Sequence, residues 1–427
     1  MKKFVNQFFE LERDELPVIL LLFISFFCSI AVFQILKPLK KGLFVEVYGA
    51  ETELYAKLLN ILTATVAMVV FTYLYNRLSR RGLIFSICGF FIVAFALLTL
   101  FLQDPDAYSI WGFYLVGDLV TTLLVAGFWA YATDITRTEQ AKRLFGLIGL
   151  GLVLGGWAGI ASARALLLQI GMEGLLVLCA GLMLVIAAAT GWTEYLLPRS
   201  ESFRRNLLQR QTQEKSVQQQ TNAALEGASL ALRSPYLVAI VGLMASYEIA
   251  SQVMDYQFSS LAEQLSGVTE TQAFMTDVYF FANMLSVLVQ LFLVSLIMRK
   301  AGLVVTLLVM PAAILLSSLS FLFIPTLFVS GLLVISDNGL NYSIQQTGRE
   351  TLYMITTPDE KYKARAFINM FVQRLAKGIA ILAVLGLGAL AVPLPFLSLL
   401  AIAAVVLMIL CGVFAGRRFN RQSEQSE

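Results

Sequence analysis

Charged side chains stand inside several long apolar stretches of this 427-residue chain, and they are the first candidates for chemistry. Lysines close the first apolar stretch, acids interrupt the fourth and seventh, and a basic pair enters the eleventh. An ionisable residue near the centre of a membrane-crossing helix is costly unless it faces a cavity or a partner. These positions therefore predict a polar pathway, and their charges predict which solutes it would accept.

Three lysines end the first apolar stretch, in the sequence QILKPLKKGLF. Lys37, Lys40 and Lys41 are spaced i, i+3 and i+4, so they share one face of a helix. Pro38 between them predicts a kink or the end of that helix. The cluster suits capture of a polyanion, and the alternative is that the lysines reach the outer lipid headgroups.

Acidic residues occur in two further stretches. Asp118 is the most isolated acid of the chain, and Glu248 and Asp255 lie two turns apart on one helical face. These acids predict substrate contacts or titrating groups. The alternatives are a structural ion pair between helices for Asp118 and simple exposure near a helix end for Asp255.

The tenth apolar stretch carries an unusual density of polar groups. Asp337 and Asn338 are followed by Asn341, Tyr342 and Ser343. Such a density favours a water-filled cavity, although hydrogen bonding between helices would also account for it.

Basic residues lie late in the chain. Arg374 and Lys377 are spaced i, i+3 and share a helical face, and Arg349 precedes Glu350. Arginine binds phosphate as a bidentate fork and lysine as a point charge, so the first pair suits a phosphorylated solute. Both could instead reach the inner headgroups, and Arg349 with Glu350 could form an inner gate or a loop ion pair.

Several kinds of chemistry have no matching motif. The chain has no histidine, and its four cysteines show neither a C-x-x-C pair nor zinc spacing. It also lacks a G-x-x-x-x-G-K-[ST] phosphate loop, a G-x-S-x-G elbow and an H-E-x-x-H pair. We therefore expect no enzyme, no metal, no cofactor and no ATP-driven pump, which leaves transport driven by exchange or by an ion gradient.

The elements that must position these charges are membrane-spanning helices. The chain is 58% hydrophobic and only 14% charged, whereas a soluble domain has about 25% charged residues. A crossing needs about 20 apolar residues, and twelve segments qualify. They are 17–36, 57–76, 83–103, 109–132, 144–169, 174–197, 236–256, 274–298, 302–323, 326–346, 366–390 and 393–415.

A polar, glutamine-rich stretch divides the twelve segments evenly. We expect a six-helix bundle over 1–198, a cytoplasmic linker over 199–235 and a second bundle over 236–427. The turns RLSRRGL and MRKAGL occupy equivalent places in the two halves, as do TRTEQAKRLF and TTPDEKYKARAF. Parallel repeats of this kind predict an all-α, major facilitator-like fold.

Loop charges set the orientation, and small residues set one helix contact. Arginines and lysines concentrate in the loops on the side of both termini, so we expect both termini in the cytoplasm and the chain in the cell inner (plasma) membrane. Gly151, Gly155 and Gly159 form a repeated G-x-x-x-G, which predicts close packing of the fifth span on a neighbour.

Four segments, in order and spacing, resemble a known family. They are ILKPLKKGLFV, YLVGDLVTTLLVAGFWAYATDITRTEQAKRLFGLIGLG, MDYQFSS and RETLYMITTPDEKYKARAFINMFVQRLAKG. Together they resemble the ATP/ADP translocases of plastids and obligate intracellular bacteria, which are nucleotide carriers unrelated to the mitochondrial kind. The resemblance covers nearly the whole chain and implies twelve helices and nucleotide exchange.

The resemblance also assigns roles to single charges. It places the family's transport-essential lysine on Lys40 and its two acids on Asp118 and Asp255. The late basic residue falls on Lys377, with Arg349 next. Both acids are Asp where the family usually has Glu, and Lys37-Pro38 replaces its usual Arg-Asp, which is typical of a divergent bacterial branch.

Three functions follow as hypotheses. The first is a secondary transporter that exchanges nucleotides or a related phosphorylated anion. The second is a proton-coupled carrier of another solute or a lysolipid flippase, and the third is a membrane scaffold without transport. The expected partners are the phosphorylated solute and the lipid bilayer, with no nucleic acid, and we take a monomer as the expectation.

Overall fold

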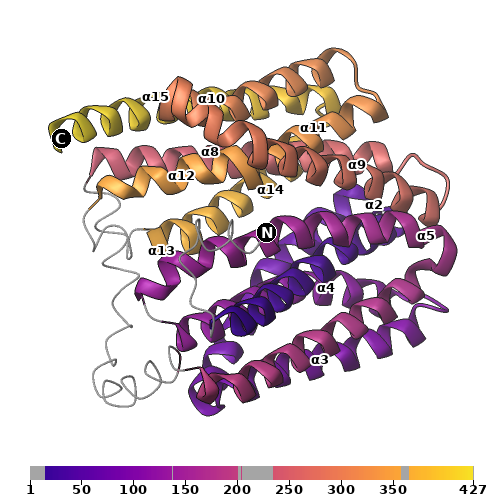
Figure 1. The fold of residues 1–427 in the computed structure, drawn as a ribbon. Helices are drawn as coiled ribbons and strands as arrows, with labels where there is room; N and C mark the ends of the chain where they lie inside the picture. The colour runs from indigo at the N-terminus through magenta and orange to yellow at the C-terminus, as the bar shows by residue number, and fades with distance from the viewer. Residues whose placement is uncertain (1–14, 137, 201–202, 204–233, 357–364, 427) are drawn as a thin grey trace. The chain divides into compact units, whose positions relative to one another are not determined.

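In the computed structural model, helices are the only regular elements among the described residues, 15–136, 138–200, 203, 234–356 and 365–426 (Figure 1). Most of the predicted linker 199–235 lies outside these residues, and so does 357–364. The first half contains α2 (Leu16–Arg77), α3 (Arg80–Phe101), α4 (Ala107–Ile135), α5 (Thr138–Leu196) and the short η1 (Leu197–Arg199).

The second half contains long α-helices and several short helical segments between them. The long ones are α8 (Pro235–Ala262), α9 (Val268–Leu288), α10 (Val294–Phe323), α11 (Leu327–Leu340), α14 (Gln373–Ala389) and α15 (Ser398–Ser426). The short ones are α12 (Gln346–Leu352), α13 (Arg365–Phe367), the π-helical η2 (Val289–Leu293), η3 (Asn341–Gln345) and η6 (Ile368–Val372), and the 3₁₀-helical η4 (Tyr353–Ile355) and η7 (Leu394–Leu397).

Seven helical stretches of the described residues are long and apolar enough to cross a membrane, so the chain is a multi-pass membrane protein. Three of them run for 62, 52 and 56 residues, well beyond the roughly 20 needed for one crossing. Each contains a glycine with positive φ: Gly49 at 80°, Gly171 at 69° and Gly302 at 80°. Only glycine adopts this conformation readily, so these residues break the long helices.

Of the two outcomes predicted at Pro38, a kink or the end of the first helix, the end is wrong. Helix α2 continues through Pro38, and its only residue with non-helical dihedrals is Gly49. A membrane helix tolerates the missing N–H of proline when neighbouring groups satisfy the freed carbonyl. The predicted loop between 17–36 and 57–76 is therefore helical, and this extra helix carries Lys40, Lys41 and Lys57.

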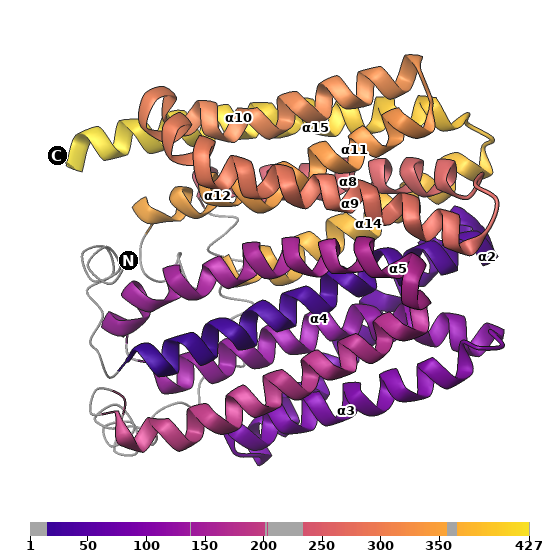
Figure 2. The same ribbon diagram turned by 45° about the vertical axis from the view of Figure 1, so that its right-hand side comes forward.

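Contacts between Cα atoms divide the chain into two compact units. The first comprises 1–44 and 59–217, and the second comprises 45–58 and 218–427. In the first unit α3 packs against α4 and against α5 (Figure 2). In the second unit α15 packs against α8 and α10, α9 against α11, and α8 against α14.

Close packing at the G-x-x-x-G repeat is confirmed inside the first unit. A Cβ atom placed on Gly159 would lie 2.5 Å from the carbonyl oxygen of Ala31 in α2, and one on Gly155 would overlap the carbonyl of Phe27. A Cβ on Gly151 would lie 3.1 Å from the carbonyl oxygen of Phe23. Helix α5 therefore meets the backbone of α2 with no room for a side chain, as small residues permit in lipid.

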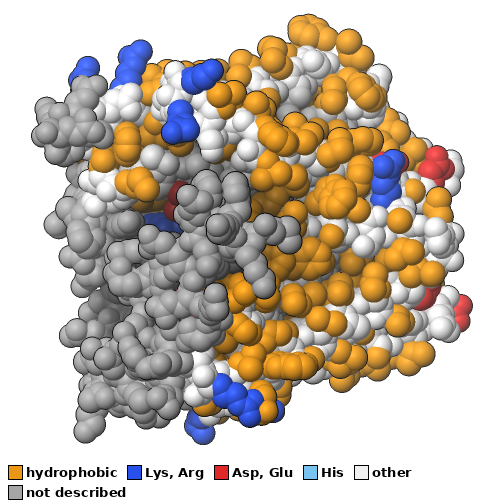
Figure 3. All heavy atoms as spheres, viewed as in Figure 1, with side chains coloured by type: hydrophobic (Ala, Val, Ile, Leu, Met, Phe, Trp, Pro, Cys, Tyr) orange, Lys and Arg blue, Asp and Glu red, His pale blue; other side chains and the backbone are white. Residues whose placement is uncertain are grey.

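The surface of the described residues is largely apolar. Hydrophobic side chains dominate the described part of the face drawn in Figure 3, where charged side chains are few. Large exposed residues include Leu62, Val66, Leu168, Phe292 and Leu410. A soluble protein rarely presents such a surface, and a bilayer solvates it.

Candidate functional site

Lys40 and Asp118 meet within the first unit. The ammonium of Lys40 in α2 forms an ion pair with Oδ1 of Asp118 in α4. The lysine side chain is 5% exposed and the aspartate 26%, so the pair is open on the carboxylate side. The same ammonium lies 4.6 Å from the ring centroid of Tyr114, one turn before Asp118. The ring's negative face adds a second attraction for the cation.

Two neighbouring residues fix the geometry of this pair. A Cβ atom on Gly117 would lie 2.7 Å from Cδ of Lys40, so glycine makes room for the lysine stem. Asn60 of α2 donates from Nδ2 to the second carboxylate oxygen of Asp118. The hydroxyl of Thr63 donates to Oδ1 of Asn60 at 3.3 Å, which orients that amide with its nitrogen toward the acid.

A second lysine–acid cluster lies within the second unit. Nζ of Lys57 lies 2.6 Å from Oδ2 of Asp255 in α8 and 3.3 Å from Oε1 of Glu53, one turn earlier in α2. Glu53 also accepts a hydrogen bond of 2.7 Å from the hydroxyl of Ser259. Lys57 is 7% exposed and Glu53 1%, so both charges depend on these partners.

The same segment of α2 is tied to α8 and α9 at three more points. Glu46 accepts from the backbone N–H of Gly267 at 2.9 Å and from the hydroxyl of Thr271 at 2.8 Å. The backbone N–H of Ala50 donates to Oε2 of Glu263 at 2.6 Å. Residues 45–58 are thus held in the second unit by charged groups as well as by apolar packing.

A third charged cluster of the second unit surrounds Arg349. Its guanidinium donates to Oδ1 of Asn341 at 3.0 Å and lies 5.6 Å from the ring centroid of Tyr247. Asn341 begins the π-helical turn η3, and such turns are frequent at functional sites because they redirect side chains. Asn341 therefore orients the guanidinium of Arg349.

Two acids complete this third cluster. Asp337 of α11 is 6% exposed and accepts a hydrogen bond of 2.7 Å from the hydroxyl of Ser251 in α8. Glu248 of α8 lies within electrostatic range of Lys377, Asp337 and Arg349. Four charges from α8, α11, α12 and α14 therefore converge in one bundle.

The remaining predicted residues take other positions. Lys41 is buried at 5% exposure, and Lys37 and Arg374 are half-buried. The amide of Asn338 donates to the carbonyl of Val334 in its own helix at 3.3 Å. Glu350 pairs with Arg365 at 2.7 Å, so its ion-pair partner is Arg365 and not the adjacent Arg349.

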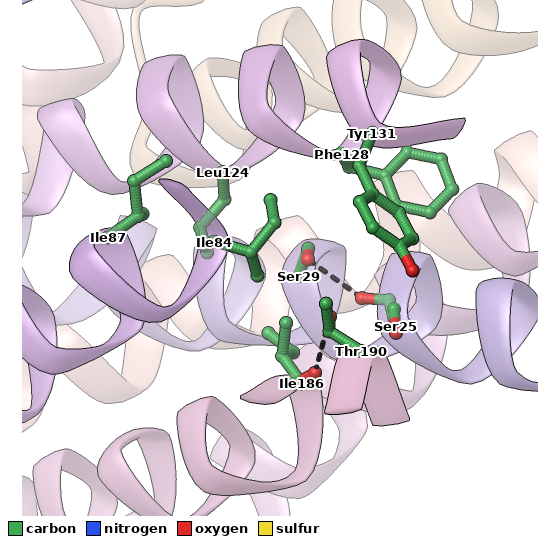
Figure 4. A pocket seen from close by; sticks show the side chains of 9 residues that line it. All are labelled: Ser25, Ser29, Ile84, Ile87, Leu124, Phe128, Tyr131, Ile186 and Thr190. Atoms are coloured by element: carbon green, nitrogen blue, oxygen red, sulfur yellow. Dashed lines mark hydrogen bonds between the residues drawn. The ribbon is translucent and has the colours of Figure 1, made fainter. Parts of the chain in front are cut away.

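A small internal cavity of the first unit is no substrate site. Its volume is about 10 Å³, and Ser25, Ser29, Tyr131 and Thr190 point into it among apolar side chains (Figure 4). The Ser29 hydroxyl donates to the carbonyl of Ser25 and the Thr190 hydroxyl to that of Ile186. This space suits about one water molecule.

The arrangement supplies exchangeable partners for an anion. Lys40 and Lys57 are each paired with a carboxylate inside an apolar bundle. An incoming phosphate could take the place of that carboxylate. A sequence profile of TLC ATP/ADP transporters matches residues 1–107 and 105–330. The chain belongs to the TLC ATP/ADP transporter family.

Full-length relatives in this family come from bacteria and plants. The chain is 24% identical to ADP,ATP carrier protein 1 of Chlamydia trachomatis serovar D, over 98% of this chain and 91% of that protein. It is 23% identical to the chloroplastic ADP,ATP carrier protein 2 of Arabidopsis thaliana, over 98% of this chain and 77% of the relative.

Solved structures of other transporters share the fold. The peptide transporter PepTSo of the POT family superposes with a TM-score of 0.62 at 13% identity, over 96% of this chain and 99% of the other. A bacterial homologue of the iron transporter ferroportin gives 0.62 at 13% identity, over 94% and 99%. These likenesses show a major facilitator-like fold for this TLC-family member.

Sequence reasoning missed Asn60, Glu53 and Lys57 as members of the charged clusters. Lys57 is the first residue of the predicted second span, 57–76, and Glu53 lies before that span begins. The spacing Glu53-x-x-x-Lys57 was a usable signal, because residues four apart share a helical face. That signal has meaning only if residues 37–56 are helical, and the predicted spans left that segment out.

Proposed function

We propose that this TLC-family member exchanges nucleotides of the ATP/ADP type, or a closely related phosphorylated anion, by alternating access. The observation that carries the proposal is the ion pair of Lys40 and Asp118. Its cation is buried in a spanning helix, while its carboxylate is partly open and held by Asn60. Family membership supplies the substrate class.

This ion pair would favour exchange of one substrate for another over uncoupled movement of a single substrate. A buried ammonium is costly without a counter-charge, and Asp118 supplies one when no substrate is bound. A nucleotide phosphate would replace Asp118 as the partner of Lys40, with Tyr114 keeping the ammonium in place. The acid then needs Asn60 to remain charged, and it recaptures the lysine as the substrate leaves.

The second unit carries its own candidate contacts for a phosphorylated solute. Arg349 presents a guanidinium already oriented by Asn341, and Lys377 supplies a second positive charge near Glu248. A fork and a point charge together suit a polyphosphate chain. We include Lys37, Lys41, Asp255, Asn338 and Arg374 as further candidates for substrate contact.

The proposed architecture completes this function. We infer twelve crossings in two six-helix halves, 1–198 and 236–427, joined by the cytoplasmic linker 199–235. Both termini would lie in the cytoplasm and the chain, as a monomer, in the plasma membrane. The seven apolar helical stretches would supply ten crossings, because three of them are long enough for two each, and the helical runs 327–355 and 365–389 would supply the other two.

Exchange in proteoliposomes tests the proposal. Vesicles preloaded with ADP should take up labelled ATP, and vesicles without internal nucleotide should not. Lys40→Gln should reduce uptake to background, whereas Lys300→Gln at the exposed turn of α10 should retain it. The exchange function is wrong if correctly folded protein mediates no uptake of labelled nucleotide into vesicles preloaded with nucleotides or with other phosphorylated metabolites.

A second candidate function rests on the acids Glu248 and Asp337. Two carboxylates in one bundle could carry a proton with another solute. In that case an imposed pH gradient would drive uptake without internal substrate, and Glu248→Gln would abolish it. Flipping of a labelled lysolipid in the same vesicles tests the flippase version, and the absence of every activity would favour a scaffold.

A further inference from the structure

The first unit carries an apolar groove that none of the proposed transport steps uses. The groove has a volume of about 530 Å³, within the roughly 300–1,000 Å³ of small-molecule sites. It runs along α2 from Leu62 to Leu74, and α3 and α4 close it with Phe90 and Leu123. Thr63 and Ser86 are the only polar residues among those that line it.

The groove opens outward and has the length of one bilayer leaflet. Leu62 and Val66 are each 64% exposed, Val70 is 50% and Phe90 is 53%. From Leu62 to Leu74 the helix rises about 18 Å, close to the roughly 15 Å half-thickness of the hydrocarbon core. A groove of this composition in a membrane protein accepts a hydrocarbon chain, because it has almost no partner for a polar ligand.

Basic side chains stand at one end of the groove. Arg77 follows Leu74 by one turn of α2, and Arg81 lies in the first turn of α3, five residues before Ser86. Both are exposed, and their guanidinium groups lie 5.3 Å and 4.8 Å from the ring centroids of Tyr73 and Phe85. Arg80 between them is instead paired with Glu194 at 2.9 Å.

We propose that this groove is a binding site for an anionic phospholipid. One acyl chain lies along α2 between Leu62 and Leu74, and the phosphate headgroup sits on Arg77 and Arg81. Basic groups beside spanning helices attract anionic headgroups, and the aromatic rings hold the two guanidinium groups at the level of the interface. The occupant comes from the leaflet on the Arg77 side.

The far end of the groove reaches the candidate transport site. Thr63 lines the groove, and its hydroxyl also holds Asn60, which donates to Asp118. Leu119, another lining residue, directly follows Asp118 in α4. A bound acyl chain would therefore pack against the residues that position the ion pair, and it would exclude water from that side.

Lipid binding can be measured without any transport assay. The purified chain in detergent is titrated with phosphatidylglycerol or with phosphatidylcholine of the same acyl chains, and bound lipid is counted by native mass spectrometry. The phosphatidylglycerol adduct should persist at higher collision energy and bind more tightly. Arg77→Gln and Arg81→Gln should each weaken it by about fivefold, because each basic group near the headgroup contributes about that factor.

Matched variants separate this site from general lipid adhesion. Val66→Trp should remove the tight adduct by filling the groove, and Val70→Trp provides a second test if the first variant folds poorly. Val177→Trp, at an exposed valine of α5 outside the groove, should leave it unchanged. Arg299→Gln and Lys300→Gln, in the equivalent basic turn of α10, should also leave it unchanged.

Three results would overturn the proposal. They are equal binding of both lipids, a tight adduct that survives Val66→Trp and Val70→Trp, and equal losses in Arg77→Gln and Arg299→Gln. Because the readout is bound lipid, a failure of nucleotide exchange would leave this result untouched.

Discussion

Lys57 and Asp255, 198 positions apart, form an ion pair of 2.6 Å inside the second unit. The lysine belongs to the helical segment after Pro38, and the acid belongs to α8. Glu53 shares the same ammonium, so one cation serves two carboxylates. This relationship makes residues 45–58 part of the second unit, although they precede most of the first unit in sequence.

Removing Lys57 should destabilise the protein more than removing Asp255. Lys57→Met leaves Glu53 buried at 1% exposure with a second carboxylate close by, which should cost about 3 kcal/mol of unfolding free energy. Asp255→Asn leaves Lys57 paired with Glu53, so its cost should be about 1 kcal/mol. Thermal melting in detergent checks this order, and equal costs would show that the three charges do not act together.

Gly117→Ala should impair nucleotide exchange through Lys40. The added Cβ would lie 2.7 Å from Cδ of the lysine, so the ammonium must leave its place beside Asp118. A shift of about 1 Å in a site of this kind can lower a rate up to about a hundredfold. Gly112→Ala in the same helix is the control, because nothing lies within 4 Å of its Cβ position. Equal exchange rates in the two variants would contradict the role of Gly117.

Gly159→Ala should loosen the contact of α5 with α2. The new Cβ would lie 2.5 Å from a backbone oxygen of Ala31, which cannot turn aside as a side chain can. Overpacking of this kind costs about 1–3 kcal/mol. Gly181→Ala, in the second part of α5, meets nothing within 4 Å and should melt like the parent protein. A normal melting temperature for Gly159→Ala would mean that the helices can separate freely at this point.

The two candidates for the late basic residue should respond differently to a conservative change. Arg349→Lys keeps the charge but loses the fork that donates to Asn341, so exchange should fall by at least about tenfold. Lys377→Arg should retain most of the activity if that residue acts as a point charge. The reverse order, measured as initial rates of ATP uptake, would assign the phosphate contact to Lys377 instead.

The cap of α4 gives a pH-dependent contribution outside the membrane. Asp106 accepts a hydrogen bond of 2.8 Å from the backbone N–H of Ser109, and this bond lowers the pKa of Asp106 below its ordinary value. Its contribution to stability is complete above the unfolded pKa of about 4 and is lost as the pH falls through the folded pKa. Asp106→Ala should therefore lower the melting temperature at pH 7 and have little effect near pH 2. Asp104→Ala is the control, and a pH-independent loss for Asp106→Ala would contradict the capping role.

The sequence was enough to single out several charges as candidates for function. Hydrocarbon penalises an isolated charge strongly, so Lys40, Asp118 and Asp255 stand out in apolar stretches without any structure. The glycine repeat of α5 was equally readable, because only small residues allow two helix backbones to touch. The apolar stretches likewise predicted a multi-pass helical protein, and the exact number of twelve crossings stays a prediction.

Tertiary structure decided which charges meet. Sequence spacing carries no information on partners 78 or 198 positions apart, so the pairs Lys40–Asp118 and Lys57–Asp255 follow only from helix packing. The continuation of α2 through Pro38 also follows only from the tertiary structure. A proline bends or ends a helix unless neighbouring groups replace its lost hydrogen bond. Composition could thus predict that this chain lies in a bilayer and that burying its charges there costs free energy. The packing of the helices determined which partners offset that cost.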